Sequence, residues 1–137
     1  MSVFVDTSVW YASLDRGEYA NARARSILNC NEPLITTDHV LVETWMLLRR
    51  RAQHNVADRF WERLRQGVAT IESVTLADLE VAWEIGANYA DQDFSIVDRT
   101  SLAVMRRLGI ERVASFGHHF GVFRFGPDRR HAFTVLH

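Results

Sequence analysis

Short apolar segments rich in β-branched residues alternate with helical patterns along the whole chain, and this alternation restricts the fold. The segments expected to form strands are residues 2–6 (SVFVD), 33–37 (PLITT), 68–74 (VATIESV), 112–116 (RVASF) and 132–137 (AFTVLH). Strands separated by helices are typical of parallel sheets that carry helices on both faces. We therefore expect an α/β fold, with one domain over residues 1–137 and a central, mostly parallel sheet of about five strands.

Helical patterns fill the segments between these strands. They cover residues 9–14, 19–28, 38–51, 56–66, 76–90 and 95–108. Two pairs, Thr75 with Asp78 and Ser95 with Asp98, have the spacing of a capping box, in which a hydroxyl and a carboxylate cap the start of a helix. Gly109 follows the last helix in the position where a left-handed residue ends one.

The composition is that of an ordinary globular protein, with 47% apolar and 24% charged residues. The N-terminal sequence MSVFVDTSVW lacks the features of a secretory signal, and no apolar run approaches the roughly 18 residues that span a bilayer. The single cysteine, Cys30, excludes an internal disulfide. We expect a soluble, cytoplasmic protein with no membrane partner.

All 16 basic residues are arginines, and this excludes a lysine nucleophile and Schiff-base chemistry. Guanidinium groups suit phosphate oxygens, whereas a GC-rich coding bias accounts for the same composition without any function. No glycine-rich phosphate loop follows the first strand, so the usual nucleotide-binding motifs are also excluded.

Two carboxylates stand out against apolar surroundings. Asp6 closes the first predicted strand, where it is either the N-cap of the next helix or a ligand at the carboxyl end of the sheet. Glu43 is the only charged residue in VLVETWMLL, a helical segment that is apolar all round and therefore expected to be buried. An unpaired buried carboxylate is strongly unfavourable, so Glu43 requires a partner, which is either an arginine of the run 49–51 or a cation.

Asp98 begins a helix whose apolar positions predict burial, and it has both a capping and a functional interpretation. Asp93, just upstream, is expected in a solvated loop, from which it could support a site indirectly. Asp6, Glu43 and Asp98 together supply carboxylates from one strand end and two helices, without a cysteine cluster or an H-E-x-x-H motif. Such an all-oxygen set favours Mg²⁺ or Mn²⁺ over zinc, and these ions suit phosphodiester hydrolysis.

Four segments resemble one known family in their order and spacing. They are FVDTSVW, HVLVETWMLLRRR, DFSIVDRTSLAVMRRLGI and VASFGHHFGVFRFG, and together they cover nearly the whole chain. The chain looks like a PIN domain, and particularly like the VapC toxins of bacterial toxin–antitoxin pairs. The resemblance implies a single PIN-like α/β domain and a Mg²⁺- or Mn²⁺-dependent endoribonuclease that cleaves structured RNA such as tRNA or ribosomal RNA.

By position, Asp6, Glu43 and Asp98 match the acidic metal-site residues of the family, and Ser8 matches the small hydroxyl residue that supports the first aspartate. The resemblance also implies a VapB-like antitoxin, bound in a groove walled by residues 9–14 and 40–48, and a homodimer. The alternative is a PIN fold that binds RNA or antitoxin but has lost catalysis.

One position departs from the family pattern. A fourth aspartate commonly stands where this chain has Gly117, either through natural variation or through a change that blunts a toxic nuclease. We expect this loss to weaken a second metal site and to reduce activity. The neighbouring His118 is expected to face solvent and His119 to pack the loop, neither acting as a metal ligand.

Overall fold

Five short strands form one sheet in which every neighbouring pair is parallel. The computed structural model describes residues 1–137, and the strand order is β3-β2-β1-β4-β7. The strands are β1 (Val3–Val5), β2 (Leu34–Thr37), β3 (Thr70–Glu72), β4 (Arg112–Ala114) and β7 (Thr134–Leu136). The predicted parallel five-stranded sheet is therefore confirmed.

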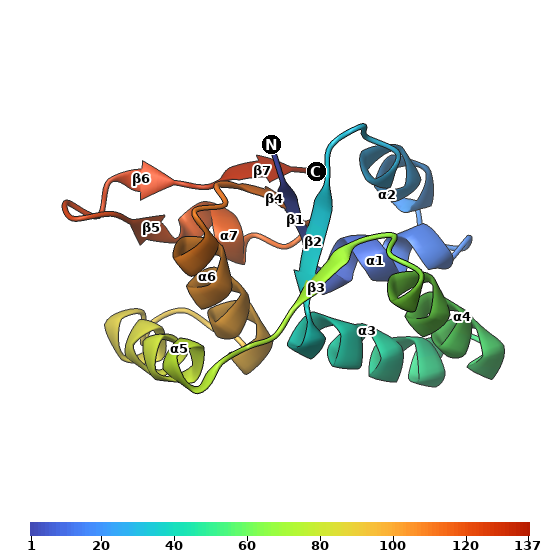
Figure 1. Cartoon of the computed structure of the whole chain (residues 1–137), viewed down its shortest axis with the longest axis horizontal. Coiled ribbons are helices and arrows are strands. Elements are labelled where there is room, and N and C mark those ends of the chain that lie inside the picture. The colour runs from blue at the N-terminus through green and yellow to red at the C-terminus, as the bar shows by residue number, and fades with distance from the viewer.

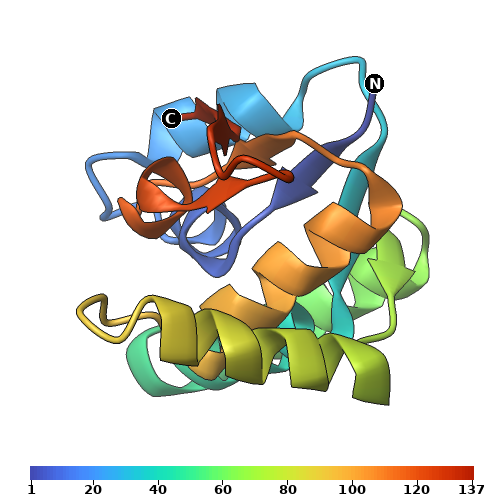
Figure 2. The same cartoon turned by 90° about the vertical axis from the view of Figure 1, so that its left-hand side faces the viewer.

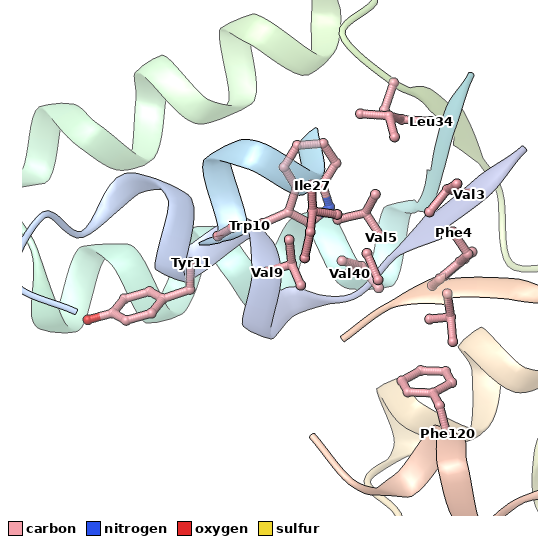
Figure 3. Close-up of a cluster of buried hydrophobic side chains, with 14 of the residues drawn as sticks. Val3, Phe4, Val5, Val9, Trp10, Tyr11, Ile27, Leu34, Val40 and Phe120 are labelled. Carbon is pink, nitrogen blue, oxygen red and sulfur yellow. The ribbon is translucent and has the colours of Figure 1, made fainter. Parts of the chain in front are cut away.

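The central strand is buried on both of its faces, as is typical of a parallel sheet covered by helices. Val3, Phe4 and Val5 have no exposed surface. Figure 3 shows Val5 on the side of Trp10 in α1 (Thr7–Leu14), Ile27 and Val40, while Phe4 lies on the side of Phe120. This burial explains why β1 is a continuous apolar run instead of an alternating one.

Helices cover both sides of the sheet (Figure 1). On one side lie α1, α2 (Asn21–Leu28) and α4 (His54–Arg65), with α3 (Asp38–Arg51) below them. On the other lie α5 (Leu76–Asn88), α6 (Ile96–Leu108) and the short α7 (His119–Val122). Figure 2 shows α5 and α6 packed against each other. None of these helices has the length and hydropathy of a membrane span.

Several helix ends are those that the sequence predicts. Both capping boxes are present, with Thr75 and Asp78 at the start of α5 and Ser95 and Asp98 at the start of α6. Gly109 ends α6 at φ +68°, in the left-handed region. Asp6 is the N-cap of α1. Local hydrogen-bonding rules therefore account for where these helices begin and end.

The C-terminal region differs from the prediction. The segment 132–137 is not one strand: β6 (His131–Ala132) pairs antiparallel with β5 (Arg124–Phe125), and only β7 joins the main sheet. The buried Phe133 lies between them and stacks on Phe125, with ring centroids 4.7 Å apart. An aromatic contact thus interrupts what the sequence presents as continuous strand.

Helix α3 also differs, because it is not buried all round. Val40, Thr44 and Leu48 form its buried face, whereas Val42 is 53% and Met46 49% exposed. The helix lies at the edge of the molecule, so one apolar face is left uncovered. That face borders the candidate site described next.

Candidate active site

The strand order reverses at β1, because β2 and β3 lie on one side of it and β4 and β7 on the other. In open parallel sheets, ligands bind beyond the carboxyl ends of the strands at such a switch point. Asp6 directly follows β1 and Ser115 directly follows β4. The backbone pairing continues past the strand, since Asp6 N donates to Ala114 O at 3.0 Å. These two residues are thereby held side by side.

The Asp6 side chain is oriented by two hydroxyls that both bind the same oxygen. Its Oδ2 accepts from Ser8 Oγ at 2.8 Å and from Ser115 Oγ at 3.0 Å. Ser8 thus contacts Asp6 directly, and its role in supporting a metal ligand stays a prediction. Oδ1 makes no hydrogen bond, although Asp6 is only 8% exposed. One carboxylate oxygen is fixed by the protein, and the other is free to bind a ligand.

Asp98 has the same division between its two oxygens. Its Oδ2 accepts from the backbone N–H of Ser95 at 3.0 Å and lies 2.8 Å from His119 Nδ1. Its Oδ1 has no hydrogen-bond partner. The His119 ring is in turn packed edge-on against Phe94, with centroids 5.1 Å apart. Asp98 therefore caps α6 and presents a free oxygen at the same time.

Glu43 lies on α3 and is partly buried, yet it makes no ion pair, and its one polar neighbour is the Thr7 hydroxyl. Arg50 lines the same groove but is not bonded to it, so the arginine partner considered from the sequence is not found. The Thr7 hydroxyl beside it is buried and lacks a hydrogen-bond partner of ordinary geometry. The site thus contains a carboxylate without a cationic partner next to a buried hydroxyl.

The three carboxylates are near enough to affect one another electrostatically. Burial raises the pKa of Asp6 above its usual range; the hydroxyls of Ser8 and Ser115 oppose this, and the charge of Asp98 adds to it. Burial also raises the pKa of Glu43; Thr7 opposes the shift, and the charges of Asp6 and Asp98 add to it. Ionising this group of acids is unfavourable until a cation neutralises them.

The remaining candidate residues lie around this group. Asp93 is exposed and makes no hydrogen bond, so its supporting role stays a prediction. Gly117 is exposed, and its N–H donates to Ser115 Oγ at 3.1 Å. Ser115 and His119 are not among the site residues expected from the sequence. Ser115 lies 109 residues from the aspartate that it binds, and only its place directly after a strand hints at a role.

An apolar groove of about 550 Å³ opens beside Glu43. It is lined by Thr7, His39, Val42, Glu43, Met46, Leu47, Arg50 and Val97. Helix α3 thus forms its main wall. That an antitoxin binds along residues 40–48 stays a prediction. Helix α1 contributes Thr7 and none of residues 9–14, so the second expected wall is not found.

The profile of the PIN domain matches residues 3–125 of this chain. The chain belongs to the PIN-domain family. It is 38% identical over 125 residues to the 23S rRNA-specific endonuclease VapC20 of Mycobacterium tuberculosis, and the match covers 90% of this chain and 95% of that relative. The family resemblance found in the sequence motifs, including that to VapC toxins, is confirmed.

Solved structures agree with this assignment. The crystal structure of M. tuberculosis VapC20, described as a sarcin–ricin loop cleaving toxin, superposes with a TM-score of 0.80 at 35% identity, covering 85% of this chain and 90% of that one. A toxin–antitoxin complex from Klebsiella pneumoniae has a TM-score of 0.63 at 14% identity, covering 85% and 87%, and shows the fold alone.

Nucleases of the PIN-domain family generally depend on divalent metal ions, and the residues of this PIN domain fit such an ion. The free oxygens of Asp6 and Asp98, with the unpaired Glu43 carboxylate and Thr7 hydroxyl, form an all-oxygen donor set. No three acidic, histidine or cysteine side chains stand in a preformed metal cluster. The suitability of these residues for a divalent ion is therefore judged from their oxygen donors and negative charge.

We predict that Glu43→Gln stabilises the metal-free protein at neutral pH. Because the folded-state pKa of Glu43 is raised, its ionisation destabilises the fold as pH rises through that pKa. Below pH 4.5, its ordinary value, the carboxyl is protonated in both states and the difference disappears. A gain of about 1 kcal/mol corresponds to roughly 4 °C in Tm. Thermal unfolding in EDTA at pH 7 and pH 4 measures it.

In the same experiment, Mn²⁺ should raise the Tm of the wild type more than that of the variant, because binding to the folded state adds stability. Equal melting temperatures for the two proteins at pH 7, with and without Mn²⁺, would show that the Glu43 charge neither destabilises the metal-free fold nor binds the ion.

We predict that His119→Ala weakens Mn²⁺ binding by about 10- to 100-fold, the usual effect of removing a group that orients a metal ligand. The reason is that Asp98 would lose one of the two groups that hold its Oδ2, the other being the Ser95 N–H. His119→Asn retains a donor at a similar place and should recover much of the affinity. Titration calorimetry or Mn²⁺ electron paramagnetic resonance gives the affinities.

His118→Ala is the matched control, since His118 is exposed and bonds to no carboxylate. If both alanine variants bind Mn²⁺ like the wild type, His119 has no part in positioning Asp98 for a metal.

Proposed function

We propose that this chain is the toxin of a type II toxin–antitoxin pair, a Mg²⁺- or Mn²⁺-dependent endoribonuclease that cleaves 23S rRNA. The substrate is inferred from VapC20, a 23S rRNA-specific endonuclease that is similar to this chain over nearly its whole length. The proposed catalysis is supported by two carboxylates near the switch point of the sheet, Asp6 and Asp98. In each, one oxygen is hydrogen-bonded within the protein and the other is free.

In this proposal, Asp6, Glu43 and Asp98 hold one or two divalent ions, directly or through water. Such an ion activates water and screens the charge that develops on the phosphate. Ser8 and Ser115 hold Asp6, and His119 with Ser95 holds Asp98, so that their free oxygens face the ligand.

The overall reaction is hydrolysis of one phosphodiester. An oxygen from water forms a new bond to phosphorus as the bond to the 3′ oxygen breaks in line. The leaving oxygen takes up a proton, and the products carry a 5′-phosphate and a 3′-hydroxyl. The type of end is therefore a direct readout of this chemistry.

VapC toxins pair with antitoxins, and the groove along α3 suits part of such a partner. Val42 and Met46 give it an exposed apolar wall, onto which an amphipathic helix or an extended segment can dock. Its position beside Glu43 would let a bound segment block the carboxylates. We also propose that the toxin is a homodimer.

The test is cleavage of a synthetic 23S sarcin–ricin hairpin by the purified protein with Mg²⁺ or Mn²⁺. We expect 5′-phosphate ends, complete inhibition by EDTA, and a rate at least about 100-fold lower for Asp6→Asn. Sequencing of RNA 5′ ends after induction extends the test to total RNA. The same ends from Asp6→Asn would show that this site is not the nuclease.

Gly117→Asp tests the effect of the missing fourth carboxylate. A Cβ at this position would meet only Ser115 Oγ, at 3.6 Å, and the backbone needs no positive φ, so the substitution fits. We expect about a tenfold faster cleavage, equivalent to roughly 1.4 kcal/mol of barrier. Gly117→Asn is the uncharged control of nearly equal shape.

Equal rates for the wild type and Gly117→Asp would refute the role assigned to this position. No cleavage by the wild type with either ion, together with retained antitoxin binding, would instead identify a PIN-fold binding module.

A further inference from the structure

Four arginines from three different elements line a second hollow, of about 210 Å³, away from the acidic site. Arg16 lies just after α1, Arg25 lies on α2, and Arg59 and Arg63 lie one turn apart on α4. Leu14, Val56 and Phe60 form an apolar part of the lining. Nothing in the function proposed above uses this arginine pocket.

None of these guanidinium groups is paired within the protein. The ion pairs of the chain involve Arg65, Arg107, Arg112 and His119, and no side-chain hydrogen bond comes from Arg16, Arg25, Arg59 or Arg63. Elsewhere arginine is bonded extensively: Arg107 alone binds Asp78, Glu72 and a backbone carbonyl. The arginine pocket therefore gathers four guanidinium groups that no carboxylate of the chain binds directly.

The acidic residues adjacent in sequence are engaged elsewhere. Asp15 accepts from Tyr11 Oη at 2.8 Å and from Gly17 N at 2.9 Å. Asp58 accepts from Trp45 Nε1 at 3.0 Å, and Glu62 pairs with Arg65 at 2.7 Å. These three carboxylates are thus held by other donors, and no carboxylate lines the pocket, so its guanidinium groups are available to an anion from outside.

Phosphate is the anion that best matches this set. Guanidinium groups form paired, planar hydrogen bonds to phosphate oxygens and are weakly hydrated, so several of them can close around one phosphodiester. The net charge of the chain is only −1, so the pocket is a local feature and not part of a generally basic surface.

The position of the pocket relates it to the candidate active site. Asp6 caps the N-terminus of α1, and Leu14, which lines the pocket, is the last residue of the same helix. Eight helical residues correspond to roughly 12 Å, a distance that a strand of a few nucleotides spans. One RNA substrate can therefore reach both places.

We propose that the arginine pocket binds a backbone phosphate of the RNA substrate at a distance from the scissile bond. This inference rests on the proposed ribonuclease function. It adds an anchoring site whose contacts are to the backbone, so they contribute affinity and register while the sequence is read elsewhere.

The test measures RNA binding without cleavage. All proteins carry Asp6→Asn, and the probe is a fluorescent sarcin–ricin hairpin titrated at several salt concentrations. For Arg59→Ala with Arg63→Ala we expect at least tenfold weaker binding at low salt. We also expect the slope of log affinity against log salt to fall by about 0.7 for each phosphate that the variant no longer neutralises.

Arg106→Ala with Arg130→Ala is the matched control, because it removes the same charge from exposed, unpaired positions outside the pocket. It should change the affinity less than threefold and leave the slope nearly unaltered. Arg59→Lys with Arg63→Lys should keep the salt slope but show part of the decrease in affinity. Circular dichroism melting verifies that each variant is folded.

Equal affinity and slope for the pocket variant and the control would overturn the proposal. If the pocket variant is impaired only in binding a poly-glutamate peptide, the site recognises an acidic protein segment and not RNA. A wild type that binds the hairpin as described but cuts nothing with Mg²⁺ or Mn²⁺ would refute the nuclease function and leave this binding site standing.

Discussion

The carboxylate of Asp6 is removed from water at the point where β1 ends and α1 begins, and the surrounding residues are arranged to make this possible. The parallel pairing of β1 with β4 brings Ser115 beside it, and the first turn of α1 brings Ser8. Together they satisfy one oxygen and leave the other open. A buried charge that is only half satisfied is unfavourable for folding and useful for binding a cation.

The ion pairs of the chain distinguish the candidate metal ligands from an acid that joins two helices. Asp6 and Glu43 have no arginine partner, and Asp98 has only His119, although the chain contains 16 arginines. By contrast, Asp78 of α5 is paired with Arg107 of α6. Burial raises the pKa of Asp78, but the hydrogen bonds from Arg107 and Thr75 outweigh it, so the pKa lies below its usual value. Asp78 is thus neutralised within the chain, while the candidate ligands have no arginine partner.

The sequence predicts the features that depend on local rules and misses those that depend on distant contacts. The position of Asp6, the capping boxes and the parallel sheet can be predicted from hydrophobic periodicity and from capping residues a few positions apart. Glu43 stands out in the sequence because a lone charge in an apolar segment needs an explanation.

The contacts of Ser115 with Asp6 and of His119 with Asp98 join residues 109 and 21 positions apart. Neither residue type is unusual where it stands, and the position of Ser115 directly after a strand is only a weak local signal. The short α7 and the β5–β6 hairpin are not predicted, because these segments are held by the stacking of Phe123 and Phe125 on Phe133 more than by a periodic pattern.

The double use of Asp98 has a consequence for interpreting related sequences. One of its oxygens accepts the capping-box hydrogen bond at the N-terminus of α6, and the other is available to a ligand. Selection for folding alone is therefore sufficient to retain this aspartate. A relative that had lost its nuclease activity would still benefit from keeping it. Glu43 caps no helix and makes no ion pair, and its partial burial is unfavourable despite the nearby Thr7 hydroxyl. Whether a relative keeps or loses a glutamate at that place is therefore the more informative record of its catalytic history.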